Sequence, residues 1–137
     1  MNIIAQTLYS LILAIFFMSC TTTKESSLKY KIEKEFKYFT FYEKGYASFY
    51  DHKWAGRTTA NGEKFNPELL TAASKTLPFN STVMVKNTIT GRSVFVRITD
   101  RGPYVKGRVI DLSAAAARKL GISRMGIAKV EVYLASN

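Results

Sequence analysis

The chain has 137 residues, which gives room for one domain of ordinary size and little more. Its apolar fraction of 47% and aromatic fraction of 13% are too high for a disordered chain. The formal net charge is +10, from 20 Lys and Arg against 10 Asp and Glu, and this surplus predicts a polyanionic partner. Nucleic acid, an anionic membrane and an acidic glycan all satisfy it, so charge alone does not choose between them.

The N-terminal sequence predicts an export signal. Residues 11–18 read LILAIFFM, an apolar run typical of a secretory signal core and shorter than the about 20 residues that cross a membrane. Cys20, the only cysteine of the sequence, follows a small residue directly after this run, an arrangement that resembles a lipobox. Phe17 and Met18 are bulkier than usual in such a motif, and no Lys or Arg precedes Lys24. The alternative is an uncleaved hydrophobic anchor with an incidental cysteine.

Both interpretations place the folded part outside the cytoplasm, so nucleic acid is not an expected partner. We expect residues 1–20 to be a lipoprotein signal peptide. Lipidated Cys20 would then anchor a cell-envelope protein to a bacterial membrane, facing the periplasm. A single cysteine also predicts that the domain has no internal disulfide.

Residues 21–44 are rich at first in Thr, Ser, Lys and Glu, which predicts a tether between anchor and domain. The second half of this segment, FKYFTFY at residues 36–42, is too aromatic for a flexible linker. We expect it to pack on the domain as an extra edge strand. The domain itself is predicted to occupy residues 45–137.

From residue 45 onward the patterns favour short strands, tight loops and two short helices. Alternating or aromatic-rich runs predict strands at residues 45–51, 81–88, 92–100, 108–113 and 129–134. Asn66 followed by Pro67 predicts a first helix that carries the apolar residues up to Ala73. Ser113 is a predicted N-cap for a second helix, AAAARKL, with Gly121 after its end. This mainly β pattern is typical of a β-barrel or a β-sandwich.

The acids of the domain are few enough to sort by position: Asp51, Glu63, Glu68, Asp100, Asp111 and Glu131. Turn, helix-terminus or outward strand positions account for four of them, which leaves Glu63 in TANGEKF and Asp100 in TDRGPY. Asp100 ends a predicted strand and opens a Gly-Pro loop, a rigidly supported position where functional residues concentrate. The alternative is a structural acid that bonds loop N–H groups or pairs with Arg101.

Several motifs in order resemble the rare lipoprotein A (RlpA) family. They are GYASFYD, GRTTANGEKF, TAASKTLPFNSTVMVKNTITGRSVFVRITDRGPYVKGRVIDLS and AAAARKLG, which together cover essentially residues 45–134. The resemblance implies a six-stranded double-psi β-barrel with two short helices, exported and usually lipid-anchored. It also implies a lytic transglycosylase that cuts peptidoglycan glycan strands lacking stem peptides.

Such enzymes cleave the bond between N-acetylmuramic acid and N-acetylglucosamine without water, and the C6 hydroxyl of the muramic sugar attacks its own anomeric carbon. The chemistry needs a proton donor for the leaving oxygen and an acceptor for the C6 proton. The resemblance makes Asp100 the principal acid/base and Glu63 its partner, each close enough to influence the other's pKa. It also suggests glycan-binding residues, some of which could equally be buried: Tyr50, Trp54, Arg57, Ser74, Arg97, Arg101 and Tyr104.

One position departs from the family pattern. Active members usually carry a histidine where this chain has Ser74 in TAASKTLP. Serine can hydrogen-bond a carboxylate but cannot relay a proton at neutral pH. The only histidine, His52, is expected to be a solvated loop residue. With one His and one Cys, no zinc site is predicted, and we expect no cofactor and a monomer.

The sequence therefore supports two hypotheses about function. The first is a peptidoglycan lytic transglycosylase that uses Asp100 and Glu63, favoured because both acids are present. The second is a non-catalytic wall-binding or expansin-like loosening module, favoured by Ser74. An envelope scaffold that binds another protein is a third, weaker alternative.

Overall fold

The computed structural model describes residues 25–28, 30 and 38–135. Residues 25–28 are helical and exposed. They belong to a unit separate from the barrel, which begins at Phe39. The predicted signal peptide, Cys20 and most of the tether lie outside the described residues. None of the described helices is long and apolar enough to span a bilayer.

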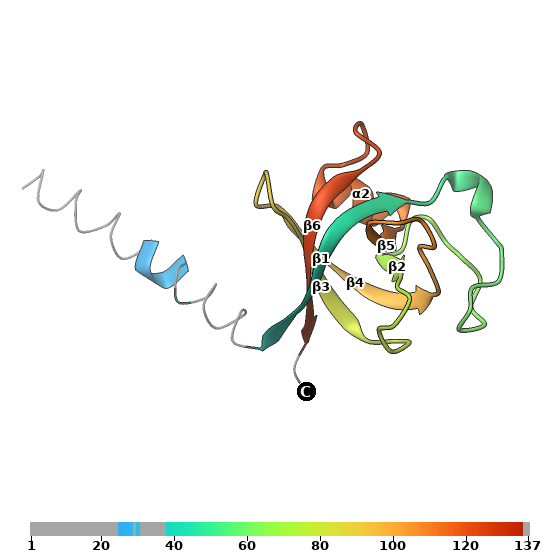
Figure 1. Cartoon of the computed structure of the whole chain (residues 1–137), viewed down its shortest axis with the longest axis horizontal. Helices are drawn as coiled ribbons and strands as arrows, with labels where there is room; N and C mark the ends of the chain where they lie inside the picture. Colours follow the sequence, from blue (N-terminus) through green and yellow to red (C-terminus); the bar gives the residue numbers. More distant parts are fainter. Residues whose placement is uncertain (1–24, 29, 31–37, 136–137) are drawn as a thin grey trace, which may run out of the picture. The chain divides into compact units, whose positions relative to one another are not determined.

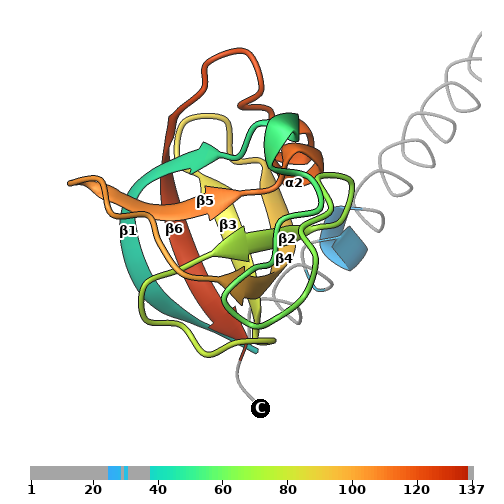
Figure 2. The ribbon, with the colours of Figure 1, turned by 90° about the vertical axis from the view of Figure 1, so that its right-hand side faces the viewer.

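Within residues 38–135 the chain forms one closed β-barrel (Figures 1 and 2). The strands are β1 (Phe39–Phe49), β2 (Thr71–Ala73), β3 (Thr82–Asn87), β4 (Ser93–Asp100), β5 (Arg108–Leu112) and β6 (Ala128–Ala135). Their order around the barrel is β1-β5-β2-β4-β3-β6. The pairs β1–β5 and β2–β4 are parallel and the remaining pairs antiparallel. The predicted mainly β barrel is confirmed.

The barrel interior is filled by branched aliphatic side chains. Val94, Val96 and Ile98 alternate along β4 and are at most 3% exposed, as the alternating pattern predicts, whereas Phe95 between them points outward. The other strands supply matching fully buried residues: Val83, Val85, Ile110, Leu112, Val130 and Val132. This packed interior makes the strand ends rigid supports for any side chain placed there.

Helix α2 (Ala114–Leu120) packs on the barrel and confirms the second predicted helix. The Ser113 hydroxyl accepts a hydrogen bond from the Ala116 amide, which satisfies an N–H that the first turn leaves free. Gly121 ends the helix in the left-handed conformation, with φ of 80°. Local capping signals were sufficient to define this element.

The prediction of a first helix that begins at Asn66 and Pro67 is wrong. The Asn66 side chain accepts a hydrogen bond from the Glu68 amide, but the result is a turn and no helix follows. Residues 71–73 instead form the short strand β2, which lies between β4 and β5 and is buried throughout. An Asx turn and a helix N-cap use the same side-chain contact, so the local signal does not separate them. Burial of β2 between two strands decides the outcome.

The barrel also begins earlier than the predicted boundary at residue 45. Residues 39–44, which include the described aromatic residues before Gly45 from Phe39 onward, form the first half of β1 and pair with β6. Gly45 therefore lies inside a strand. A Cβ there would stand 2.5 Å from Val109 Cγ1 and 3.0 Å from the Gly107 carbonyl oxygen, so β5 approaches too closely for a side chain. This glycine marks a close strand approach.

Candidate active site

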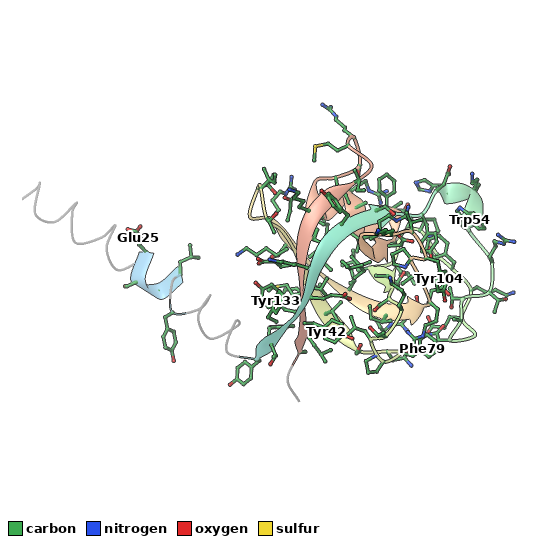
Figure 3. All side chains as sticks on the ribbon, viewed as in Figure 1. Glu25, Tyr42, Trp54, Phe79, Tyr104 and Tyr133 are labelled. Atoms are coloured by element: carbon green, nitrogen blue, oxygen red, sulfur yellow. The ribbon has the colours of Figure 1, made fainter. Side chains whose placement is uncertain are left out.

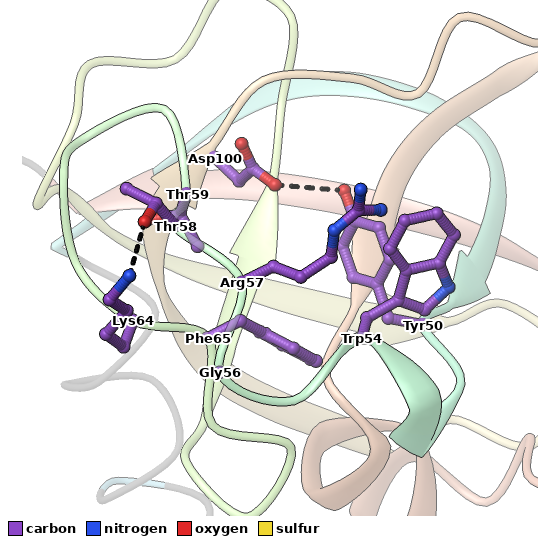
Figure 4. Close-up of a pocket in the computed structure, with 9 residues that line it drawn as sticks. All are labelled: Tyr50, Trp54, Gly56, Arg57, Thr58, Thr59, Lys64, Phe65 and Asp100. Atoms are coloured by element: carbon purple, nitrogen blue, oxygen red, sulfur yellow. Dashed lines mark hydrogen bonds between the residues drawn. The ribbon is translucent and has the colours of Figure 1, made fainter.

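A pocket of about 460 Å³ opens beside the ends of β1 and β4 (Figure 4). Asp100 is the last residue of β4 and Tyr50 follows β1, while the long loop after β1 supplies the remaining walls. In Figure 3, Trp54, Tyr104 and Phe79 lie on the right-hand side of the view and Tyr133 and Tyr42 farther to the left. The pocket is lined by Tyr50, Trp54, Gly56, Arg57, Thr58, Thr59, Lys64, Phe65 and Asp100.

Asp100 is the acidic side chain of the pocket lining, and its carboxylate is held by three hydrogen bonds. Oδ1 accepts from the backbone amides of Ala60 and Arg101, each at 2.9 Å. Oδ2 accepts from the Tyr50 hydroxyl at 3.3 Å. Asp100 therefore does bond loop N–H groups, as the structural alternative in the sequence analysis predicted. The described ion pairs do not include one between Asp100 and Arg101. Because the same carboxylate faces the pocket, these bonds also fix its orientation toward a bound molecule.

Tyr50 lines the pocket and hydrogen-bonds Asp100, and its predicted stacking on a sugar ring stays a prediction. Its half-buried ring meets Phe65 edge-on, with ring centroids 5.4 Å apart, and its hydroxyl points to Asp100 (Figure 4). Burial raises the pKa of the Tyr50 hydroxyl, and the negative charges of Asp100 and Asp111 raise it further. The hydroxyl therefore stays protonated and donates to Asp100 throughout the neutral and mildly alkaline range.

We expect Tyr50→Phe to lower kcat by about 3- to 10-fold with little change in KM, if the Asp100 carboxylate acts in turnover. The reason is that a typical hydrogen bond contributes about 1 kcal/mol, and here its loss frees one oxygen of the reacting group. Steady-state turnover of the glycan strands that the family resemblance implies as substrate measures the effect. A rise in KM at constant kcat would instead assign Tyr50 to sugar binding.

Trp54 and Arg57 form a basic, aromatic wall of the pocket. The Arg57 guanidinium carbon lies 4.5 Å from the centre of the Trp54 ring, within cation–π range. Lys53 approaches the same ring at 5.9 Å. On the other side of the pocket, the Lys64 ammonium donates to the Thr58 hydroxyl at 2.8 Å. The structure therefore brings Trp54 and Arg57 to the pocket, together with a second cation, Lys64.

Glu63 does not line this pocket. Its carboxylate pairs side-on with the Arg97 guanidinium: Nη1 to Oε1 is 2.6 Å and Nη2 to Oε2 is 2.8 Å. These hydrogen bonds with Arg97 hold the pKa of Glu63 below its ordinary value. In the structure the charged partner of Glu63 is therefore Arg97, and the expected influence of Glu63 on Asp100 stays a prediction.

Three other predicted binding residues have different surroundings. The Ser74 side chain is fully buried, and its hydroxyl accepts from the amides of Thr76 and Leu77, so it cannot touch a glycan. The Arg101 guanidinium donates to the Ser74 and Leu77 carbonyls and lies 3.7 Å from the centre of the Phe79 ring. It therefore holds a loop. Tyr104 is 82% exposed and outside the pocket lining, so its role stays a prediction.

The remaining acids follow their predicted structural roles in part. Asp51 caps the short 3-10 helix η1 (His52–Trp54), and His52 in that turn is exposed. Asp111 accepts from Ser48 and pairs with Arg108, in place of the expected helix-dipole contact. Glu68 pairs with Arg118. Among residues 25–28, 30 and 38–135, no three His, Cys, Asp or Glu side chains gather closely enough to hold a metal ion.

Sequence reasoning missed several pocket residues, namely Thr58, Thr59, Lys64 and Phe65, and the Ala60 amide that donates to Asp100. All belong to the segment around TANGEKF. Within that motif the family resemblance implied a functional role only for Glu63. Its neighbours enter the pocket because the segment folds back on itself, with an antiparallel bridge between Thr58 and Lys64.

Solved structures define the class of fold. The Streptomyces papain inhibitor superposes with a TM-score of 0.53 at 22% identity, over 71% of this chain and 97% of that one. The apo expansin of Clavibacter michiganensis gives a TM-score of 0.54 at 21% identity, over 69% of this chain and 50% of that one. With the two parallel strand pairs, these likenesses place the protein among the double-psi β-barrels.

The family follows from the sequence of the barrel. Residues 42–132 match the model of the lytic transglycolase family, and the chain belongs to that family. It is similar to the probable endolytic peptidoglycan transglycosylase RlpA of Nostoc sp., with 58% identity over 64% of this chain and 24% of that protein.

Two further relatives carry the name endolytic peptidoglycan transglycosylase RlpA. The Pasteurella multocida protein is 57% identical over 66% of this chain and 31% of its own length. The Rickettsia prowazekii protein is 44% identical over 83% of this chain and 37% of its own length. The chain thus spans less than two fifths of the length of each of these three relatives.

Proposed function

We propose that this protein is an endolytic peptidoglycan transglycosylase that cleaves glycan strands and leaves 1,6-anhydro-muramoyl ends. The observation that carries the proposal is a single oriented carboxylate, Asp100, in a pocket whose lining also includes basic and aromatic side chains. The names of the family and of its relatives support the same chemistry.

One carboxyl group suffices for this reaction. As an acid, Asp100 protonates the glycosidic oxygen, and the bond from the muramic anomeric carbon to that oxygen breaks. As a carboxylate, Asp100 then accepts the proton of the C6 hydroxyl while the C6 oxygen bonds to the anomeric carbon. The proton lost in the first step is regained in the second, so the enzyme returns to its starting state and no water is consumed.

The pocket walls suit the muramic sugar. Where no stem peptide is attached, its lactyl carboxylate is an anion, and Arg57 and Lys64 are cations in the pocket lining. The indole of Trp54 offers an aromatic surface for a sugar ring beside Arg57. A strand that carries a carboxylate on alternate sugars therefore matches the charge of the site better than a neutral glycan.

Digestion of purified peptidoglycan, intact and stripped of stem peptides, tests the proposal. Mass spectrometry of the products is expected to show 1,6-anhydro-muramoyl ends in the protein-treated sample. New reducing ends would instead assign hydrolysis. Absence of any product, with glycan still bound, would favour the non-catalytic wall module.

We also propose that Cys20 is lipidated and anchors the protein to a bacterial membrane with its barrel in the periplasm, as a monomer. The apolar run before Cys20 supports this proposal. Cys20→Ala is expected to move most of the protein from the membrane fraction to the soluble periplasmic fraction and to abolish labelling by a palmitate analogue. Unchanged membrane retention would contradict Cys20 as the sole anchor.

A further inference from the structure

The loop at residues 58–64 reaches the reacting carboxylate through its backbone. The Ala60 amide donates to Asp100 Oδ1, and the next amide, that of Asn61, donates to the Thr99 carbonyl at 3.1 Å. The loop is thus attached to the last two residues of β4. One of the three hydrogen bonds that orient Asp100 depends on this attachment.

The tip of the same loop is tied to β4 a second time, at a point away from the pocket lining. Gly62 has φ of 90°, a positive value that favours glycine, and it turns the chain just before Glu63. The Glu63 carboxylate then meets Arg97 on β4 with both oxygens. Its carbonyl accepts from the Thr59 amide at 2.8 Å, which closes the turn around Ala60.

Two asparagines extend this contact into a network. The Arg97 guanidinium also donates to the Asn80 side-chain oxygen at 2.8 Å. The side-chain nitrogen of Asn61, Nδ2, donates to both Glu63 Oε1, at 3.1 Å, and Asn80 Oδ1, at 3.3 Å. The four side chains join the 58–64 loop, β4 and the loop before β3. We call them the Glu63–Arg97 clamp: Asn61, Glu63, Asn80 and Arg97.

We propose that Glu63 is a positioning residue, which acts through the Glu63–Arg97 clamp to hold the Ala60 amide against the Asp100 carboxylate. The inference rests on the proposed function, because it assigns a role within that reaction. Both Glu63 oxygens are occupied by Arg97, and the side chain lies outside the pocket lining, so Glu63 does not contact the reacting sugar.

The charge state of Glu63 agrees with this role. Arg97 lowers the pKa of Glu63, so the pair is intact above the ordinary carboxyl range and is lost as the pH falls through that lowered value. The pair is also exposed, with side chains 36% and 44% accessible, and such pairs contribute little to global stability. Breaking the clamp should therefore move the loop without unfolding the barrel.

The test compares single and paired substitutions in the full-length protein, with two readouts for each variant. One is turnover of peptidoglycan strands; the other is hydrogen exchange of the Ala60 amide, followed by NMR. We expect Glu63→Arg, which faces Arg97 with a like charge, to lose Ala60 protection. Turnover should fall on the order of 10²-fold, the usual consequence of a small misplacement of reacting groups. Combining Glu63→Arg with Arg97→Glu should restore most of both.

Two further variants separate the effect of the clamp from that of an ion pair elsewhere on the surface. Arg97→Lys removes the two-pronged contact but keeps the charge, so protection and turnover should fall together. Glu68→Gln breaks the exposed pair with Arg118 outside the pocket lining and should change neither readout. Thermal unfolding of every variant is expected to match the parent protein.

Three outcomes would overturn the inference. One is loss of turnover in Glu63→Arg with Ala60 protection unchanged, since Glu63 would then act on the substrate itself. Another is loss of protection without loss of turnover. The third is a paired variant that regains Ala60 protection but no turnover. An inactive parent protein whose Ala60 protection still follows the clamp would instead contradict the proposed function and leave the structural link standing.

Discussion

Asp100→Asn is expected to reduce formation of anhydro products by about 10²- to 10⁴-fold, the usual contribution of a positioned acid or base. An amide can neither protonate the glycosidic oxygen nor accept the C6 proton. Its oxygen can still accept from Ala60 and Arg101, and the Tyr50 hydroxyl can rotate to accept from the amide nitrogen. The substitution therefore removes the chemistry while the hydrogen-bonded geometry is kept.

Product release measured by mass spectrometry, together with glycan binding by the same variant, checks this expectation. Binding should stay within a few-fold of the parent protein, because Asp100 is expected to act mainly in the transition state. The matched control is Asp51→Asn, which alters an acid that caps a surface turn outside the pocket lining and should leave turnover unchanged. Normal turnover by Asp100→Asn would rule out the proposed mechanism.

Arg57→Ala is expected to weaken binding of muramic-acid-containing strands by about 10- to 100-fold. Hydrogen bonds to charged groups contribute about 1.5–3 kcal/mol, and each 1.4 kcal/mol corresponds to a tenfold change in affinity. Arg57 also packs on Trp54, so part of the loss will come from the displaced ring. Calorimetric titration with stem-peptide-free glycan measures the total.

A neutral ligand separates the two contributions. Chitin oligosaccharides have the same backbone linkage but no lactyl group, so Arg57→Ala should affect their binding only through Trp54. We expect a clearly smaller loss for chitin than for the muramic glycan. Arg124→Ala, at an exposed arginine outside the pocket lining, controls for the general effect of positive charge. Equal losses for the two ligands would contradict recognition of the carboxylate by Arg57.

The parts of the fold that local chemistry encodes were predictable. Alternation along residues 92–100 defined β4 with its buried face, and Ser113 with Gly121 defined α2. Asp100 was a candidate because it ends a strand next to a Gly-Pro loop, and the family resemblance then implied its acid/base role. The structure places it in the pocket lining.

The features that the sequence did not predict depend on distant contacts. Asn66 makes the same side-chain bond in a turn as it would at a helix N-cap, and only β4 and β5 on either side make residues 71–73 a strand. The partner of Glu63 is Arg97, which lies 34 positions away, so no local pattern reveals that its carboxylate is occupied. Ser74 was expected to bind the glycan through its hydroxyl, but the fold buries that hydroxyl, which accepts from the Leu77 amide of its own loop.

Digestion of stem-peptide-free glycan in ¹⁸O-labelled water tests the central claim most directly. Internal attack by the C6 hydroxyl uses no solvent oxygen, so we expect anhydro-ended products that contain no ¹⁸O and that disappear with Asp100→Asn. Products with ¹⁸O at new reducing ends would show that water attacks the anomeric carbon and would contradict the transglycosylase mechanism.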